Sequence, residues 1–158
     1  MGNPSLRKLS FPEINHRWIE IKGLSATALN NGSPNDLQHN FEIAMARFLL
    51  LCQTDVAQVW ISSENDKECY LCLSFIGASV MTQEKGFTFY SVVKFKDCKV
   101  EDKQKHWLFF LNKIYEFAKS KNCKRIGLEA DFDYWHKLFK KTPLPYKYET
   151  RNSLRVYL

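Results

Sequence analysis

The sequence predicts a single-domain α/β (α+β) fold with a mixed, mostly antiparallel central sheet and helices on both faces. Three observations predict it: apolar residues recur at helical spacing from Trp107 to Ala118, strand-like segments occupy residues 56–95, and two helical segments come first. Spacings of three and four residues are typical of a helix with one buried face, whereas a spacing of two is typical of a strand. With 158 residues, the chain is long enough to bury one core.

Two helices are expected at the start of a domain that spans residues 11–158, with residues 1–10 as an N-terminal extension. Pro12 suits the first turn of a helix, and Asn31-Gly32 ends that helix. Ser33-Pro34 predicts a second helix, in which the serine caps the first turn. The predicted buried faces comprise Ile14, Trp18, Ile21 and Leu24 or Ala28 in the first helix, and Leu37, Phe41, Ala44, Phe48 and Leu51 in the second.

Three strands are expected next, at Val56–Ser62, Cys69–Ile76 and Gly86–Phe95. The polar turn Glu64–Lys67 predicts that the first two pair as an antiparallel hairpin. The second segment is apolar at nearly every position, which is typical of a central strand.

The second half of the chain predicts a long helix and three shorter elements. The helix spans residues 102–121, and its stripe comprises Trp107, Phe110, Leu111, Ile114, Phe117 and Ala118. A short strand is expected at Lys124–Ala130, a short helix at Asp133–Lys141 and a closing strand or hairpin at Tyr146–Leu158.

Charge is distributed unevenly along the chain. Residues 1–80 carry 6 Lys/Arg against 8 Asp/Glu, whereas the remainder carries 17 against 9. A basic half can attract nucleic acid, and lysines interleaved with aromatics at Phe87–Lys96 and Tyr146–Tyr148 add to that interpretation. The alternative is lysines on solvated helix faces and aromatics in the core. No apolar run approaches the roughly 18 residues that a membrane span needs, and the opening residues have no signal-peptide pattern.

The cysteines and histidines do not predict a metal site. Cys69 and Cys72 have the CxxC spacing, but in a strand these side chains point to opposite faces, so without a bend they cannot share a zinc ion. The five cysteines are expected to be reduced and mostly buried. The four histidines lack ligand spacing and are expected on helix surfaces: His16, His39, His106 and His136.

The predicted order of elements resembles that of the GNAT superfamily of acyltransferases, from about residue 11 to the end. Several short motifs are similar to those of small, divergent GNAT-like proteins of tailed bacteriophages. They are the Trp18 helix, the Ser33-Pro34 cap, Val59-Trp60-Ile61, Ile114–Lys119 with Asn122-Cys123-Lys124 after it, and Trp135–Leu138.

The resemblance implies a site for acetyl-CoA, whose pyrophosphate is held in this superfamily by the backbone amides of a Gln/Arg-x-x-Gly-x-Gly/Ala loop. The corresponding segment here, Lys96–His106, contains no glycine and carries Glu101 and Asp102, which would repel the phosphates. The candidate cofactor-binding residues are therefore lysines on flexible stems: Lys96, Lys99, Lys103 and Lys105.

The catalytic motif of the superfamily is also incomplete. Its penultimate helix often carries Asn-x-x-Ala-x-x-Leu-Tyr, in which the tyrosine protonates the leaving thiolate. Aligning Leu138 with the leucine of that motif places Phe139 at the tyrosine position and Phe132 at the asparagine position. Tyr134 is the candidate acid, and Glu129 is the candidate base, with a solvated acidic face as its alternative.

Together these features predict a catalytically degenerate GNAT-like protein, rather than an enzyme, without a cofactor or metal. The resemblance implies a phage accessory or virion-associated role as a binding or structural module, in the host cytoplasm or the virion. The expected partner is another protein, of a phage particle, with nucleic acid as a second partner class through the basic C-terminal half. The alternative is an active acetyl-CoA-dependent N-acetyltransferase.

Overall fold

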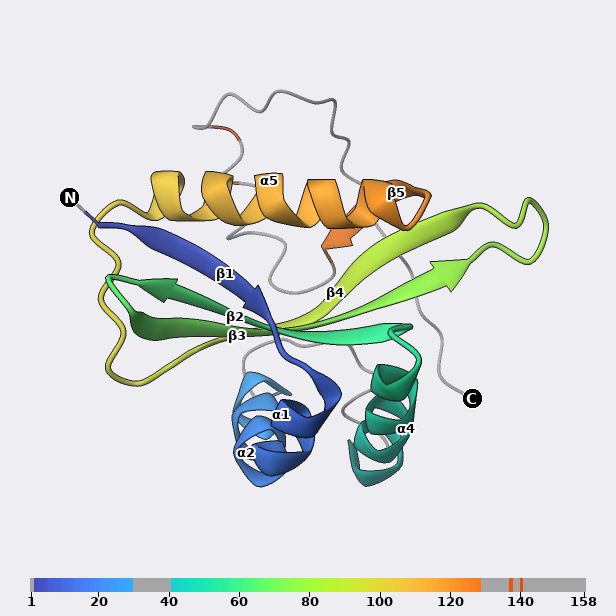
Figure 1. Cartoon of the computed structure of the whole chain (residues 1–158), viewed down its shortest axis with the longest axis horizontal. Coiled ribbons are helices and arrows are strands. Elements are labelled where there is room, and N and C mark those ends of the chain that lie inside the picture. Colours follow the sequence, from blue (N-terminus) through green and yellow to red (C-terminus); the bar gives the residue numbers. More distant parts are fainter. Residues whose placement is uncertain (1, 30–40, 129–136, 138–139, 141–158) are drawn as a thin grey trace.

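The computed structural model describes residues 2–29 and 41–128, together with Lys137 and Lys140. A five-stranded sheet separates one long helix from the helices on its other face (Figure 1). The strand order is β1-β2-β3-β4-β5, and every pair is antiparallel except β4 with β5. The predicted fold class is confirmed. The described elements are β1 (Pro4–Lys8), α1 (Phe11–His16), α2 (Trp18–Leu29), α4 (Phe41–Gln53), β2 (Ala57–Glu64), β3 (Lys67–Ala78), β4 (Lys85–Lys94), α5 (Lys103–Ser120) and β5 (Cys123–Leu128).

Strand β1 lies inside the segment that the sequence marks as an extension. It pairs antiparallel with β2, from Pro4 opposite Glu64 to Lys8 opposite Trp60. Its side chains alternate between half-buried and exposed, and Leu6 packs against the core. Five residues with a single large apolar side chain give too weak an alternation for the sequence to predict a strand.

The first predicted helix is two helices that meet at Arg17. Helix α1 starts with a capping box, in which the Ser10 hydroxyl accepts from Glu13 N and the Glu13 carboxylate accepts from Ser10 N. At the junction, the Arg17 guanidinium donates to both carboxylate oxygens of Glu68 in β3, at 2.7 and 2.8 Å. This bidentate ion pair fixes the junction of α1 and α2 against the sheet.

Helix α4 turns a slightly different face to the sheet than the sequence predicts. Met45, Phe48 and Cys52 are buried, whereas Leu51, a predicted core residue, is 41% exposed. The helix is apolar on most of its circumference, so its sequence pattern alone does not fix which side faces the core. Its predicted start at Ser33 lies outside the described residues.

The predicted antiparallel hairpin of β2 and β3 is confirmed, with a tighter turn than expected. Glu64 pairs with Lys67, which leaves Asn65 and Asp66 as the two turn residues. Both have left-handed backbone angles, with φ of 51° and 64°, as expected for a two-residue hairpin turn. Strand β3 lies in the middle of the sheet, as predicted.

Two bulges change the direction of side chains on the central strands. Between β2 and β3 the register shifts so that Cys69 is an extra residue, and between β3 and β4 the extra residue is Tyr90. Because of the first bulge, Cys69 and Cys72 both belong to the core on the α5 side of the sheet. The prediction that they point to opposite faces is therefore wrong.

The predicted long helix is α5, capped by Asp102. Its buried stripe contains the expected residues Trp107, Phe110, Leu111, Ile114 and Ala118, while Phe117 is half-buried. Strand β5 then runs parallel to the first half of β4, from Lys85 opposite Cys123 to Phe89 opposite Leu128. The predicted helix at residues 133–141 and the closing strand lie outside the described elements.

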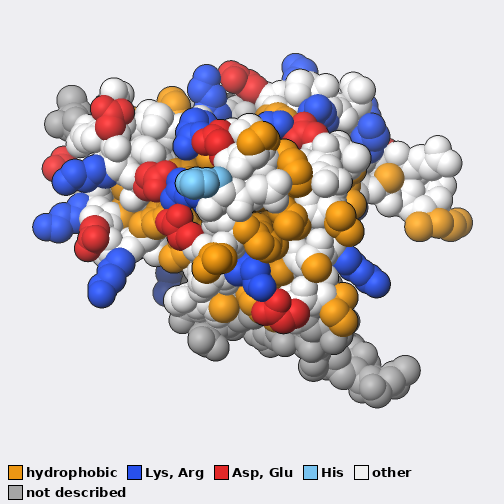
Figure 2. All heavy atoms as spheres, turned by 60° about the horizontal axis from the view of Figure 1, so that its bottom comes forward, with side chains coloured by type: hydrophobic (Ala, Val, Ile, Leu, Met, Phe, Trp, Pro, Cys, Tyr) orange, Lys and Arg blue, Asp and Glu red, His pale blue; other side chains and the backbone are white. Residues whose placement is uncertain are grey.

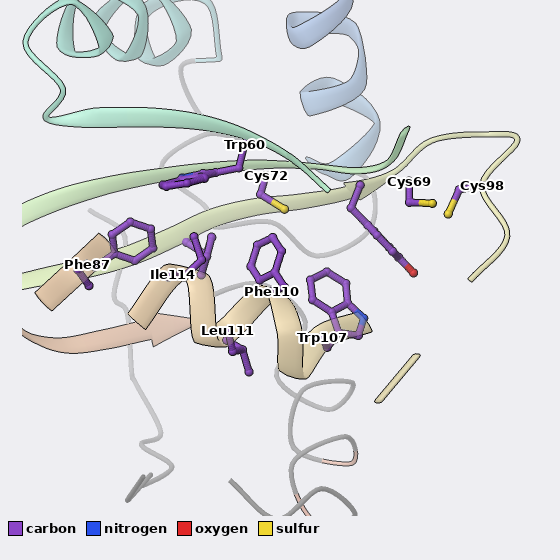
Figure 3. Close-up of a cluster of buried hydrophobic side chains, with 12 residues drawn as sticks. Trp60, Cys69, Cys72, Phe87, Cys98, Trp107, Phe110, Leu111 and Ile114 are labelled. Atoms are coloured by element: carbon purple, nitrogen blue, oxygen red, sulfur yellow. The ribbon is translucent and has the colours of Figure 1, made fainter. Parts of the chain in front are cut away.

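The sheet carries an apolar core on each face. On the α5 side, Trp107, Phe110 and Ile114 pack on side chains of β2, β3 and β4, including Trp60 and Phe87 (Figure 3). On the opposite side, alternate residues of the same strands pack against α1, α2 and α4. This second cluster includes Ile14, Ile21, Met45, Phe48, Val59, Ile61, Leu71 and Leu73.

Candidate functional site

The loop between β4 and α5, residues 95–102, is the segment in which the sequence predicts a degenerate cofactor site. Two of its side chains anchor it in the core: Cys98 is 4% exposed, and Val100 packs against the α5-side cluster. Phe95 N also donates to Cys69 O at 2.8 Å. The loop therefore lies along the core without a glycine at which a phosphate could approach the backbone closely.

The first turn of α5 has its own anionic cap. The Asp102 carboxylate accepts from Lys105 N at 3.0 Å, and its backbone carbonyl accepts the first helical bond from His106 N at 3.0 Å. A phosphate at this helix end would have to displace the Asp102 side chain and would meet its negative charge. The first-turn amide of Lys105 is thus already satisfied within the chain.

The four candidate lysines are all exposed: Lys96, Lys99, Lys103 and Lys105. The Lys105 ammonium lies 3.4 Å from Gly2 O, directed at the N-terminal segment. Lysines exposed to water contribute little binding free energy each, because their charge is screened and their side chains lose entropy when held. These residues do not fit the pyrophosphate of acetyl-CoA, since a preformed amide cradle is missing and Glu101 lies exposed among them.

His106 lies in the core rather than on the surface of α5, so the sequence-based prediction for it is wrong. It is 1% exposed, and its Nδ1 lies 2.8 Å from Glu64 Oε2 while its Nε2 lies 3.1 Å from Ser62 Oγ. With an ionised Glu64, Nδ1–H donates to the carboxylate and Nε2 accepts from the Ser62 hydroxyl. The sequence signal was the spacing of four residues between His106 and Phe110, which places both on the buried stripe.

The order Ser62, His106, Glu64 is that of a nucleophile, a base and an orienting carboxylate. Ser62, however, is 1% exposed and sits inside β2, paired to β1 on one side and β3 on the other. Gly2 covers the carboxylate, because a Cβ built on Gly2 would lie 1.7 Å from Glu64 Oε1. A substrate cannot reach Ser62 in this arrangement, so the network ties β2 to the first turn of α5.

The cysteines are buried thiols, as predicted, apart from half-buried Cys123. Burial raises the pKa of Cys52 and of Cys98 to about 12, and it raises the pKa of Cys72 further. These thiols are therefore neutral and weakly nucleophilic at neutral pH. Within residues 2–29 and 41–128, no three His, Cys, Asp or Glu side chains are grouped in a way that could hold a metal ion.

The remaining candidates divide between core residues and residues outside the described part of the chain. Phe87 and Phe89 are 0% exposed, so the core interpretation of these aromatics is confirmed and they are not a stacking platform for bases. Tyr134 and Glu129 lie outside the described residues, as do Phe132 and Phe139. His16 is exposed, as predicted. None of the described helices is long and apolar enough to cross a membrane.

Solved structures with a similar fold include acetyltransferases. A predicted acetyltransferase from Clostridium acetobutylicum, solved with acetyl-CoA, superposes with a TM-score of 0.64 at 14% identity over 98% of this chain and 96% of that one. An aminoglycoside acetyltransferase from an uncultured soil metagenomic sample, in complex with sisomicin, gives 0.62 at 12% identity over 98% and 97%. A GCN5-related N-acetyltransferase from Ralstonia eutropha gives 0.62 at 10% identity over 98% and 99%.

Comparisons of sequence alone find no match, either to a family model or to a curated protein. At identities of 10–14%, the likeness to solved structures concerns the fold and not the chemistry. The order of elements, the parallel β4–β5 pair and the helix α5 across the sheet agree with that likeness. The chain has a GNAT-like fold.

Proposed function

We propose that this protein is a catalytically degenerate GNAT-like binding or structural module that does not use acetyl-CoA. The observation that carries the proposal lies at the N-terminal end of α5, where the Asp102 carboxylate accepts a hydrogen bond from the first-turn amide of Lys105. The glycine-free loop before it, held in the core by Cys98, adds a second obstacle to phosphate. The likeness to a structure solved with acetyl-CoA concerns the fold. Asp102 and the loop before it, in contrast, are unfavourable for binding the pyrophosphate of that cofactor.

Calorimetry with acetyl-CoA at moderate salt tests the proposal. A micromolar site needs roughly 8 kcal/mol, whereas exposed lysines contribute about 0–1 kcal/mol each. We therefore expect no micromolar binding and no release of free CoA thiol in the presence of amine acceptors. A GNAT enzyme with an intact glycine loop is the positive control.

A pair of variants tests whether the negative charge of the Asp102 cap is by itself what prevents binding. Asp102→Asn keeps an N-cap acceptor but removes the negative charge, while Glu116→Gln removes a charge at an exposed position near the other end of α5. We expect both variants to bind as weakly as the unaltered protein, because neither restores an amide cradle. Micromolar binding by the unaltered protein, with turnover, would establish the N-acetyltransferase alternative.

The partner that we propose is a protein, and helix α4 supplies the surface. Ile43 and Leu50 are 57% and 63% exposed on the side of α4 away from Met45 and Phe48, and apolar side chains gather on this face of the molecule (Figure 2). A helix that is apolar on both sides is typical of one covered on both sides. Exposed Arg47 lies between Ile43 and Leu50 along the helix, which fits a partner surface that combines apolar side chains with a carboxylate.

The resemblance to tailed-phage proteins makes that partner, in our proposal, a component of a phage particle. Mass spectrometry of purified particles is expected to find the protein at a fixed stoichiometry. Leu50→Glu should remove it from particles, whereas Lys113→Glu on the exposed side of α5 should leave it in place. Detection only in infected-cell lysate would overturn this role, and binding to nucleic acid that weakens steeply with salt would assign the second partner class instead.

A further inference from the structure

Two thiols, one in β3 and one in the loop between β4 and α5, lie side by side (Figure 3). Cys69 is the bulge residue of β3, and Cys98 lies in the loop. Figure 3 shows their sulfur atoms close together and apart from Cys72. The neighbouring Cys69 thiol contributes to the raised pKa of Cys98, and the bond from Phe95 N to Cys69 O fixes the start of the loop beside β3.

We propose that Cys69 and Cys98 form a disulfide when the protein meets a peroxide, and that this bond fastens the β4–α5 loop to β3. Hydrogen peroxide first oxidises one thiol to a sulfenic acid and leaves as water. The sulfur of the second thiol then attacks the sulfenic sulfur, which forms the S–S bond and releases a second water. The two electrons lost by the two thiols reduce the peroxide. This inference does not depend on the proposed function.

The structure makes this pair selective among the five cysteines. Cys52 belongs to the core on the opposite face of the sheet, and Cys123 begins β5. Cys72 shares the α5-side core, but Figure 3 places it beside Trp60 rather than beside Cys98. A disulfide forms only between cysteines whose side chains already face each other at short range.

The position of the pair also sets how fast the bond forms. Cys69 is 1% exposed and Cys98 is 4% exposed, and burial raises the pKa of the Cys98 thiol to about 12. Oxidation of the closed loop is therefore slow, because the thiolate is the reactive form. Once formed, the bond closes a ring of about 30 residues and so restricts the unfolded chain more than the folded one.

Peptide mapping of the full chain under non-reducing conditions, after treatment with hydrogen peroxide, tests the proposal. We expect a linked peptide that joins Cys69 to Cys98, reversal by a thiol reductant and a rise in the thermal midpoint of about 5 °C. The control Cys72→Ser should form the same link, whereas Cys69→Ser should lose both the link and the thermal shift.

Mapping of the unaltered chain decides the question even if Cys69→Ser folds poorly. A link that joins Cys98 to another cysteine would overturn the inference. So would oxidation of Cys98 to a sulfinic acid while Cys69 stays a free thiol.

Discussion

At the scale of residues, His106 forms a buried polar network with Ser62 and Glu64. The carboxylate, the imidazole and the hydroxyl are buried, and each accepts or donates at 2.8–3.1 Å. A buried polar group that loses its partner keeps its desolvation cost, so such a network is more sensitive to truncation than a surface pair.

We expect His106→Ala to lower the free energy of unfolding by about 1–3 kcal/mol, because it leaves the Glu64 carboxylate without its buried partner. His16→Ala, at an exposed position, should change it by less than about 0.5 kcal/mol. Urea unfolding followed by far-UV circular dichroism measures both. Equal effects of the two substitutions would show that the network does not stabilise the fold.

The Arg17 guanidinium also donates to both carboxylate oxygens of Glu20, at 2.9 and 3.0 Å, and this ion pair predicts how stability changes in acid. Hydrogen bonding from Arg17 lowers the pKa of Glu20 below its ordinary value of 4.5. A group with a lowered folded pKa stabilises the protein above its unfolded pKa, and that contribution is lost as pH falls through the folded pKa. Because the Glu20 side chain is 47% exposed, we expect a loss of less than about 1 kcal/mol.

Chemical unfolding at pH values on either side of 4.5 measures this loss. Glu20→Gln should show a smaller decrease on acidification than the unaltered protein. A decrease of the same size in both proteins would assign the acid sensitivity to other carboxylates.

At the scale of elements, the hairpin turn between β2 and β3 holds two consecutive non-glycine residues at left-handed backbone angles. Asp66 has φ of 64°, and Asn65 before it has φ of 51°. Left-handed angles cost a non-glycine residue free energy that glycine does not lose.

We expect Asp66→Gly to raise the free energy of unfolding by about 0.5–1 kcal/mol, because Asn-Gly suits this two-residue turn. Asp66→Val should lower it, since a β-branched side chain is disfavoured at positive φ. Thermal unfolding of the unaltered protein and of the two variants gives their order of stability. A decrease with glycine would mean that the Asp66 side chain contributes more than its backbone strain costs.

At the scale of the whole molecule, one sheet shared by two cores predicts a single cooperative unit. Ile114 belongs to the core beneath α5, and Met45 belongs to the core beneath α4. Both are 0% exposed. Strand β3 contributes side chains to both cores, so neither can open without exposing the other face of the same strands.

We expect Ile114→Ala and Met45→Ala each to lower the free energy of unfolding by about 2–5 kcal/mol. The two losses should add in the double variant, because the sites lie on opposite faces of the sheet. Leu50→Ala, at a 63% exposed position, is the matched control. Far-UV circular dichroism and tryptophan fluorescence should show the same midpoint, and separate transitions would show that the two layers unfold independently.

The sequence by itself determined the fold class and several of the local elements. The stripe of α5 was predictable because Trp107, Phe110 and Ile114 recur at the helical period. The β2–β3 hairpin was predictable because a polar turn separates two apolar runs. The glycine-free loop and its carboxylates were also visible, since composition needs no tertiary structure. All of these depend on residues close to one another along the chain.

Only the tertiary structure decided which distant residues meet. Edge strand β1 exists through pairing with β2, and the bulge at Cys69 turns that thiol toward Cys98. His106 is buried because Glu64, 42 positions away, supplies its partner. The helical or strand period places a side chain on one face of its element, but long-range pairing and packing decide what covers that face. A polar side chain is buried only where a hydrogen-bond partner meets it, and that partner often comes from a distant part of the sequence.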